Sequence, residues 1–116
     1  MKLELAYPPT ANTMFPTNKQ GRRFLSPKGK TYRQGVYADV LEQHGIFKPL
    51  QGPLRVTVDF YVPDKRKRDL DNLFKALFDA LKHANVYMDD QQIVQIHAFK
   101  REVVKGGRCE LLLEEL

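Results

Sequence analysis

Alternation of apolar and polar residues predicts four β-strands. The first extends from Lys2 to Tyr7 and the second from Leu54 to Val62. Two more follow from Ile93 to Arg101 and from Arg108 to Leu113. A period of two is what a strand with one buried face requires. Because a short segment with two adjacent glycines joins the last two strands, we expect them to form a hairpin.

Helical spacing predicts two main helices. One extends from Ser26 or Lys30 to Gln43 and ends at Gly45. The other extends from Asp69 to His83, and Asn85 is expected to end it. Its apolar residues recur at helical spacing, namely Leu70, Leu73, Phe74, Leu77, Phe78 and Leu81. A stripe of this kind packs one side of a helix against a core.

The segment between the first strand and the first helix is predicted to be a long loop. Residues 8–30 contain four prolines and two glycines, which interrupt regular structure. Its aromatic residues, Phe15 and Phe24, indicate that it is partly fixed to the domain. The order β, loop, α, β, α, β, β predicts one small domain over residues 1–116 of the α/β (α+β) class. In it, a mixed β-sheet carries two main helices on one face.

Composition restricts the class of protein further. The 116 residues are enough for one domain with a modest core. No apolar run reaches the length of a membrane span, and the first residues lack the apolar centre of a secretory signal, so we expect a cytoplasmic protein. The single cysteine, Cys109, excludes an internal disulfide and is expected in the core. Three scattered histidines, His44, His83 and His97, lack zinc-ligand spacing.

Basic residues are concentrated in two segments. The net charge is +5, and no acidic residue occurs between Glu4 and Asp39. That interval holds Lys19, Arg22, Arg23, Lys28, Lys30 and Arg33. The second segment is the run Lys65, Arg66, Lys67 and Arg68. Segregated cations of this kind are typical of a surface that contacts nucleic-acid phosphates, and a basic, merely solvated loop is the alternative.

Two aspartates, Asp69 and Asp71, follow the second basic run directly. Side chains two positions apart on a helix point about 200° apart, so these two converge only if Asp69 caps the helix. One interpretation is structural: a cap, a first-turn acid, and ion pairs of Lys75 with Asp71 and Asp79. The other is functional, with the carboxylates holding a cation and Lys75 contacting a phosphate.

A second acidic pair, Asp89 and Asp90, lies in a predicted turn. Adjacent carboxylates repel, so such a pair serves either the turn or a bound cation. Three carboxylates in a basic field suit Mg²⁺, which completes its octahedral shell with water and substrate phosphates. Such an ion polarises a phosphoryl group and activates water. Asp59 points away from the apolar face of its strand, and we expect it to be solvated.

Four stretches together resemble the RusA family of Holliday junction resolvases. They are "YPPTANTMF", "PDKRKRDLDNLFKALFDAL", "VYMDDQQIV" and "KGGRCELLLEE", which span nearly the whole chain. The family consists of small, dimeric, Mg²⁺-dependent endonucleases found largely in bacteriophages and prophages. The resemblance implies a RusA-like fold and a homodimer that nicks opposing strands of four-way junction DNA in recombination and repair. It also implies a bacterial cytoplasm, Mn²⁺ as a substitute ion, and no small-molecule cofactor.

The same resemblance implies roles for individual residues. Asp69, Asp71 and Asp90 correspond to the metal-binding, catalytic aspartates, and Lys75 to a lysine that acts on the phosphate. Asp89 is either a supporting ligand or a turn former. Expected DNA-binding residues are Arg68, Asn72, Lys65, Arg66, Lys67, Lys19, Arg22 and Arg23. Two alternatives stay open, namely a non-catalytic DNA-binding dimer and a general Mg²⁺ nuclease that cuts flaps or single strands.

Overall fold

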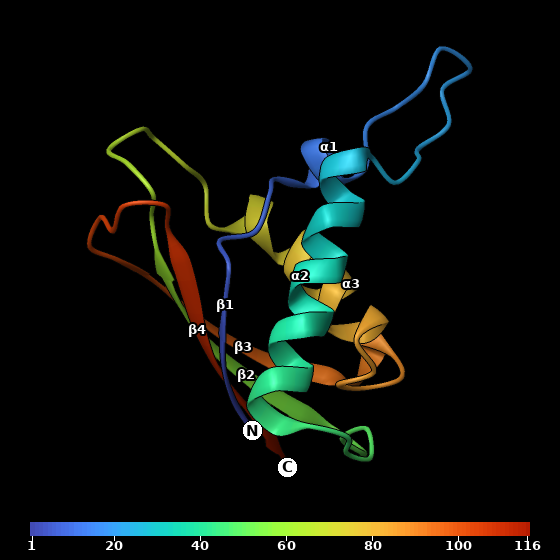
Figure 1. The fold of residues 1–116 in the computed structure, drawn as a ribbon, viewed down its shortest axis with the longest axis vertical. Coiled ribbons are helices and arrows are strands. Elements are labelled where there is room, and N and C mark those ends of the chain that lie inside the picture. The colour runs from blue at the N-terminus through green and yellow to red at the C-terminus, as the bar shows by residue number, and fades with distance from the viewer.

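The computed structural model describes residues 1–116, which form a four-stranded sheet with helices on one face (Figure 1). The elements are β1 (Lys2–Leu5), α1 (Ala11–Met14), α2 (Pro27–His44), β2 (Leu54–Tyr61), α3 (Asp71–His83), η1 (Asp90–Gln92), β3 (Ile93–Arg101) and β4 (Arg108–Glu115). The strand order is β1-β4-β2-β3, with β3 parallel to β2 and the other two pairs antiparallel. The predicted mixed sheet with two main helices is confirmed.

The predicted hairpin between the last two strands is wrong. β3 and β4 lie on opposite sides of β2, so that Phe60 of β2 aligns with Lys100 of β3 and with Cys109 of β4. The connection crosses the end of β2, where the Val104 amide donates to the Val62 carbonyl at 2.9 Å. Burial explains the order: β4 buries every second residue and takes an inner position, whereas β3 is mostly exposed and takes the edge.

Both main helices begin and end at recognisable signals. Ser26 caps α2 by accepting a hydrogen bond from the Gly29 amide at 2.9 Å, and Gly45 ends the helix with a positive φ of 68°. Beyond α3, Asn85 adopts a positive φ of 60°, as its predicted role as a stop requires. The apolar stripe of α3 is confirmed, because its residues either lie in the buried core or pack against it.

The long N-terminal loop is only partly fixed. It contains the short helix α1, whose Met14 is fully buried, and Phe15 packs against the core. Beyond Phe15, residues 17–24 extend away from the domain as a basic loop (Figure 1), and Leu25 packs against the core again. Phe24 on this loop is 45% exposed, so only the first of the two aromatic residues anchors the segment as expected.

The second face of the sheet carries no helix. Asp59 of β2 lies on this face and, instead of being simply solvated, pairs with Arg101 of β3 at 2.6 Å. Cys109 is fully buried on the helix side, as expected, and burial raises the pKa of its thiol to about 12. None of the helices has both the length and the apolar character needed to span a bilayer.

Candidate nucleic-acid interface and active site

The start of α3 presents polar side chains to solvent. Asp71, Asn72 and Lys75 are all exposed on its first turns, and Asp69 is exposed just before them. The predicted capping role of Asp69 is wrong, because Leu70 is the N-cap residue and already has helical backbone angles. The Asp69 carbonyl, not its side chain, accepts a hydrogen bond from the Asn72 amide, at 3.3 Å. The Asp69 carboxylate is therefore not used as a helix cap.

The basic run that precedes α3 contains one fixed cation and three exposed ones. Arg68 donates to the Asp64 carboxylate at 2.7 Å and lies over the Tyr7 ring at 5.9 Å. This hydrogen bond, together with the backbone amide of Arg66, lowers the pKa of Asp64 to about 2. The other three side chains, those of residues 65–67, are exposed. The chain thus anchors one end of the run and leaves the rest accessible to a phosphate backbone.

The predicted ion pairs along α3 do not form. Asp79 instead binds Arg33 of α2 through two hydrogen bonds of 2.8 and 3.0 Å, and this pairing raises the pKa of Arg33. The Lys75 ammonium lies over the Phe15 ring at 5.4 Å from its centre. Asp71 makes no ion pair at all. The ion pairs of the structural interpretation are therefore wrong, whereas Asp71 does lie in the first turn of α3 as that interpretation predicted. The Asp71 carboxylate and the Lys75 ammonium have no ionic partner.

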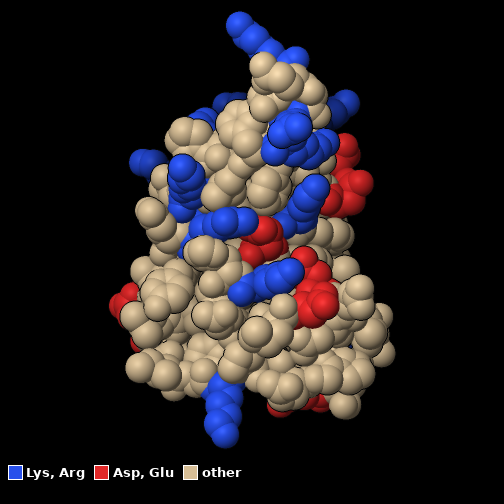
Figure 2. All heavy atoms as spheres, turned by 90° about the vertical axis from the view of Figure 1, so that its right-hand side faces the viewer, with Lys and Arg blue, Asp and Glu red and all other residues tan.

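The basic loop is rooted beside the same helix. Arg23 donates a hydrogen bond to the Phe15 carbonyl at 3.0 Å, while Lys75 approaches the ring of the same residue. Phe15 therefore connects the loop to α3. Figure 2 shows this side of the molecule, where acidic side chains lie in the middle of the face and Lys and Arg side chains border them. Such an arrangement attracts a polyanion to a surface that also holds carboxylates.

The two residues of the second acidic pair, Asp89 and Asp90, have different surroundings. Asp89 caps η1, accepting from the Gln91 amide at 2.9 Å in a reciprocal capping box, so it forms the turn, and its role as a supporting ligand stays a prediction. Asp90 is exposed and lies beside the Tyr87 hydroxyl, whose pKa is raised chiefly by burial and then by the Asp90 charge. Tyr87 donates to the Phe78 carbonyl at 2.6 Å, which places Asp90 beside the C-terminal half of α3.

The three proposed metal ligands do not meet within one chain. Asp71 begins α3, whereas Asp90 lies next to Phe78, and seven residues of helix correspond to roughly 10 Å of rise. Accordingly, no group of three acidic, histidine or cysteine side chains in this structure could hold a metal ion. The donor chemistry suits a hard divalent cation, since the carboxylates are exposed and unpaired, but their arrangement in a single chain does not form a complete site.

The sequence matches the family model described as endodeoxyribonuclease RusA over residues 6–113. It is 39% identical over 114 residues to crossover junction endodeoxyribonuclease RusA of Escherichia coli (strain K12), covering 98% of this chain and 93% of the relative. The proteins of that name from enterobacteria phage 82 and Shigella sonnei (strain Ss046) are 39% and 38% identical with the same coverage. The chain belongs to the RusA family. The resemblance found in the sequence motifs is thereby confirmed, and with it the enzyme class, a DNA endonuclease.

Two contacts of this RusA-family chain were not anticipated from its sequence. Asp64 fixes Arg68, and its position four residues earlier was the available signal for that pair. Lys100, at the end of β3, donates to the Arg68 carbonyl at 2.8 Å. No local pattern could reveal this second contact, because 32 residues separate its partners. Both contacts hold the segment that leads into Asp69.

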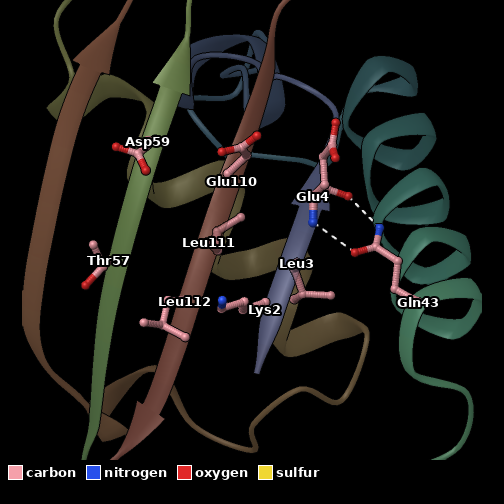
Figure 3. A pocket seen from close by; sticks show the side chains of 9 residues that line it. All are labelled: Lys2, Leu3, Glu4, Gln43, Thr57, Asp59, Glu110, Leu111 and Leu112. Atoms are coloured by element: carbon pink, nitrogen blue, oxygen red, sulfur yellow. Dashed lines mark hydrogen bonds between the residues drawn. The ribbon is translucent and has the colours of Figure 1, made fainter.

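A concavity of about 490 Å³ lies elsewhere on this RusA-family protein, on the helix-free face of the sheet and around β1 to Gln43 of α2 (Figure 3). Asp59 and Glu110 point into it, and they are paired with Arg101 at 2.6 Å and Arg108 at 3.4 Å. Because the sheet separates this concavity from α3, it is not part of the candidate active site. Its carboxylates already have cationic partners, whereas the carboxylates of Asp69 and Asp71 have none.

Proposed function

We propose that this protein is a homodimeric, Mg²⁺-dependent endonuclease that resolves four-way DNA junctions by paired nicks in opposing strands. One observation carries the proposal: unpaired Asp69 and Asp71 and the exposed Lys75 stand on one exposed helix start, directly after a basic run and beside the root of a basic loop. Membership of the RusA family supports the same activity.

The basic residues would bind the DNA backbone. Lys65, Arg66 and Lys67 are exposed to a phosphate backbone, with Arg66 also 3.5 Å from the Asp64 carboxylate, while Arg68 is held in place by Asp64. Lys19 and Arg22 are exposed on the basic loop, and would hold a second arm together with Arg23, which fixes the root of the loop at Phe15. Phosphate contacts position a protein without reading bases, so junction shape would dominate recognition.

The residues on α3 would act on the scissile phosphate. The Lys75 ammonium would donate hydrogen bonds to a phosphate oxygen, and Asn72 would orient the same group. We propose Asp69, Asp71 and Asp90 as the ligands of Mg²⁺, with Mn²⁺ as a substitute. When bound, such an ion polarises the phosphate and lowers the pKa of a coordinated water. Since no three carboxylates of one chain meet, the isolated chain is not expected to bind the ion tightly.

The biological setting is part of the proposal. A four-way junction has two-fold symmetry, and a C2 homodimer presents two copies of one site to it. We propose that the protein acts in recombination and repair in the cytoplasm of a bacterial host. The similarity to a phage protein supports a phage or prophage origin.

Charge-neutral variants of the aspartates test this proposal. We expect Asp71→Asn and Asp90→Asn each to lower junction cleavage by roughly 100-fold or more, a loss typical of removing a group that stabilises the transition state. Junction binding should persist or tighten, because less negative charge faces the phosphates. Glu42→Gln, an exposed carboxylate on α2 without an ion pair, is the matched control and should cleave normally. Cleavage by either aspartate variant at the unmodified rate would exclude the three-carboxylate site.

A further inference from the structure

The edge strand β3 is uncovered on its outer side and over most of both faces. It pairs only with β2, and seven of its nine residues are exposed. The exposed residues include Val94 at 57%, Ile96 at 44% and Phe99 at 43%. Single exposed apolar residues are ordinary, but three on one edge strand with free backbone donors and acceptors form a template for pairing with another strand.

Each face of β3 carries an exposed apolar side chain. Ile96 aligns with Val56 and therefore lies on the helix side, whereas Phe99 aligns with Asp59 on the helix-free side. Helices α2 and α3 cover the core formed by β1, β4 and β2, and no residue of β3 belongs to that buried core. Only Ile93 and Ala98 pack at its margin. An additional strand beside β3 would extend both faces over these exposed side chains.

We propose that β3 pairs antiparallel with β3 of a second copy of this chain, which joins the two sheets into one continuous sheet across the dimer. The inference rests on the homodimer of the proposed function and adds the surface through which it forms. A two-fold axis through an edge strand places the strand antiparallel to itself, so that both copies use the same residues.

Charge complementarity identifies the occupant and the direction. Asp89 and Asp90 immediately precede β3, whereas Lys100 and Arg101 end it. In an antiparallel pair of identical strands, the acidic beginning of each copy lies against the basic end of the other. A parallel pair would oppose like charges, which is unfavourable. Pairing along the whole of β3 places Ile93 opposite Arg101, so the register is centred on His97.

Lysine substitutions on β3 test the interface without DNA or metal. Lysine on an edge strand opposes pairing between chains, so Ile96→Lys should convert the dimer to a single chain of 13.5 kDa in light scattering. Because Ile96 is half-exposed, the variant should keep its circular dichroism spectrum. Ile46→Lys, at an apolar residue that is 97% exposed outside β3, is the matched control and should stay dimeric. A dimeric Ile96→Lys variant, or a monomeric unmodified protein, overturns the proposal.

A cysteine placed on the axis provides a second measurement. In a Cys109→Ser background, His97→Cys should form a disulfide-linked dimer under mild oxidation, whereas Gln34→Cys on the exposed side of α2 should not. Equal cross-linking of the two variants would contradict the interface. These two measurements do not depend on activity. A protein that dimerises through β3 but cuts no junction would contradict the proposed function alone. A protein that cuts junctions as a dimer insensitive to Ile96→Lys would contradict this interface alone.

Discussion

At the scale of single residues, Asp64 is the carboxylate whose charge state is most strongly coupled to its surroundings. Its hydrogen bond with Arg68 lowers the pKa from 3.8 to about 2. A depressed pKa in the folded state means that the ionised group stabilises the fold above pH 3.8. This contribution is lost as the pH falls towards 2. The pair also fixes the side chain of Arg68, which immediately precedes Asp69, so the same contact affects both stability and the candidate site.

Replacing Asp64 should therefore change the pH dependence of stability. The difference in the free energy of unfolding between the unmodified protein and Asp64→Asn should be constant near neutral pH and shrink as the pH falls from about 3.8 towards 2. Denaturant titrations at several pH values measure it. Asp39→Asn is a control of opposite sign, because burial raises the pKa of Asp39. A difference for Asp64→Asn that does not depend on pH would contradict the pairing.

Sequence reasoning at the residue scale succeeded where partners are close along the chain. The stop signals Gly45 and Asn85 and the burial of Cys109 were predicted correctly, because backbone preference and alternation are local properties. The ion pair of Asp79 with Arg33 joins residues 46 positions apart. It was not predicted, because Lys75 lies one helical turn from Asp79 and is the partner that local spacing favours. Local spacing shows which charges could pair, whereas packing of the two helices decides which ones do.

At the scale of elements, α2 contains two glycines with opposite surroundings. A Cβ atom on Gly29 would lie 2.7 Å from the Leu25 Cδ1 atom and 2.9 Å from the Met14 carbonyl oxygen. Gly29 therefore allows α2 to pack closely on α1. A Cβ atom on Gly35 would meet nothing within 4 Å. The first glycine is required by packing, whereas the second only weakens the helix.

Alanine substitutions should separate the two cases. Gly29→Ala should lower the free energy of unfolding by about 1–3 kcal/mol, as overpacking does. Gly35→Ala should raise it by about 0.5–1 kcal/mol, because alanine favours the helix and restricts the unfolded chain. Urea unfolding of both variants provides the measurement. Shifts in the same direction would show that close packing at Gly29 does not control this junction.

The elements themselves were largely predictable, and their order in the sheet was not. Alternation identifies which side chains of a strand are buried, but it does not state which strand lies beside it. The glycines 106 and 107 favoured a hairpin, yet they form a turn that leads the chain across the end of β2. The better clue was the pattern, since β4 buries every second residue, whereas the apolar residues of β3 fall on both faces and the strand ends in two cations.

At the scale of the whole molecule, cations border the face that carries the candidate active site (Figure 2). Replacing Lys65, Arg66 and Lys67 with Gln should weaken junction binding and reduce its dependence on salt. The slope of log affinity against log salt should fall by up to about 0.9 for each cation that contacts a phosphate of duplex DNA. Lys48→Gln, far along the chain from the run, should leave the slope unchanged. An unaltered slope for the triple variant would place the run outside the DNA-binding surface.

The sequence identified the parts of the candidate site but not their separation. Asp69, Asp71 and Lys75 belong to one contiguous motif, so their common position at the start of α3 could be foreseen. Asp90 belongs to a second motif, and only the structure shows that it lies beside the other half of the helix. This separation depends on how η1 packs on α3, a contact between distant segments that no local pattern records.

The central claim is that this chain cuts four-way junctions. The most direct test incubates the purified protein and Mg²⁺ with labelled four-way junction, linear duplex and flap DNA, beside samples with EDTA. We predict symmetric paired nicks in the junction alone, and none with EDTA. Binding to the junction without any product would contradict the claim and indicate a DNA-binding module, while equal cutting of all three substrates would indicate a general nuclease.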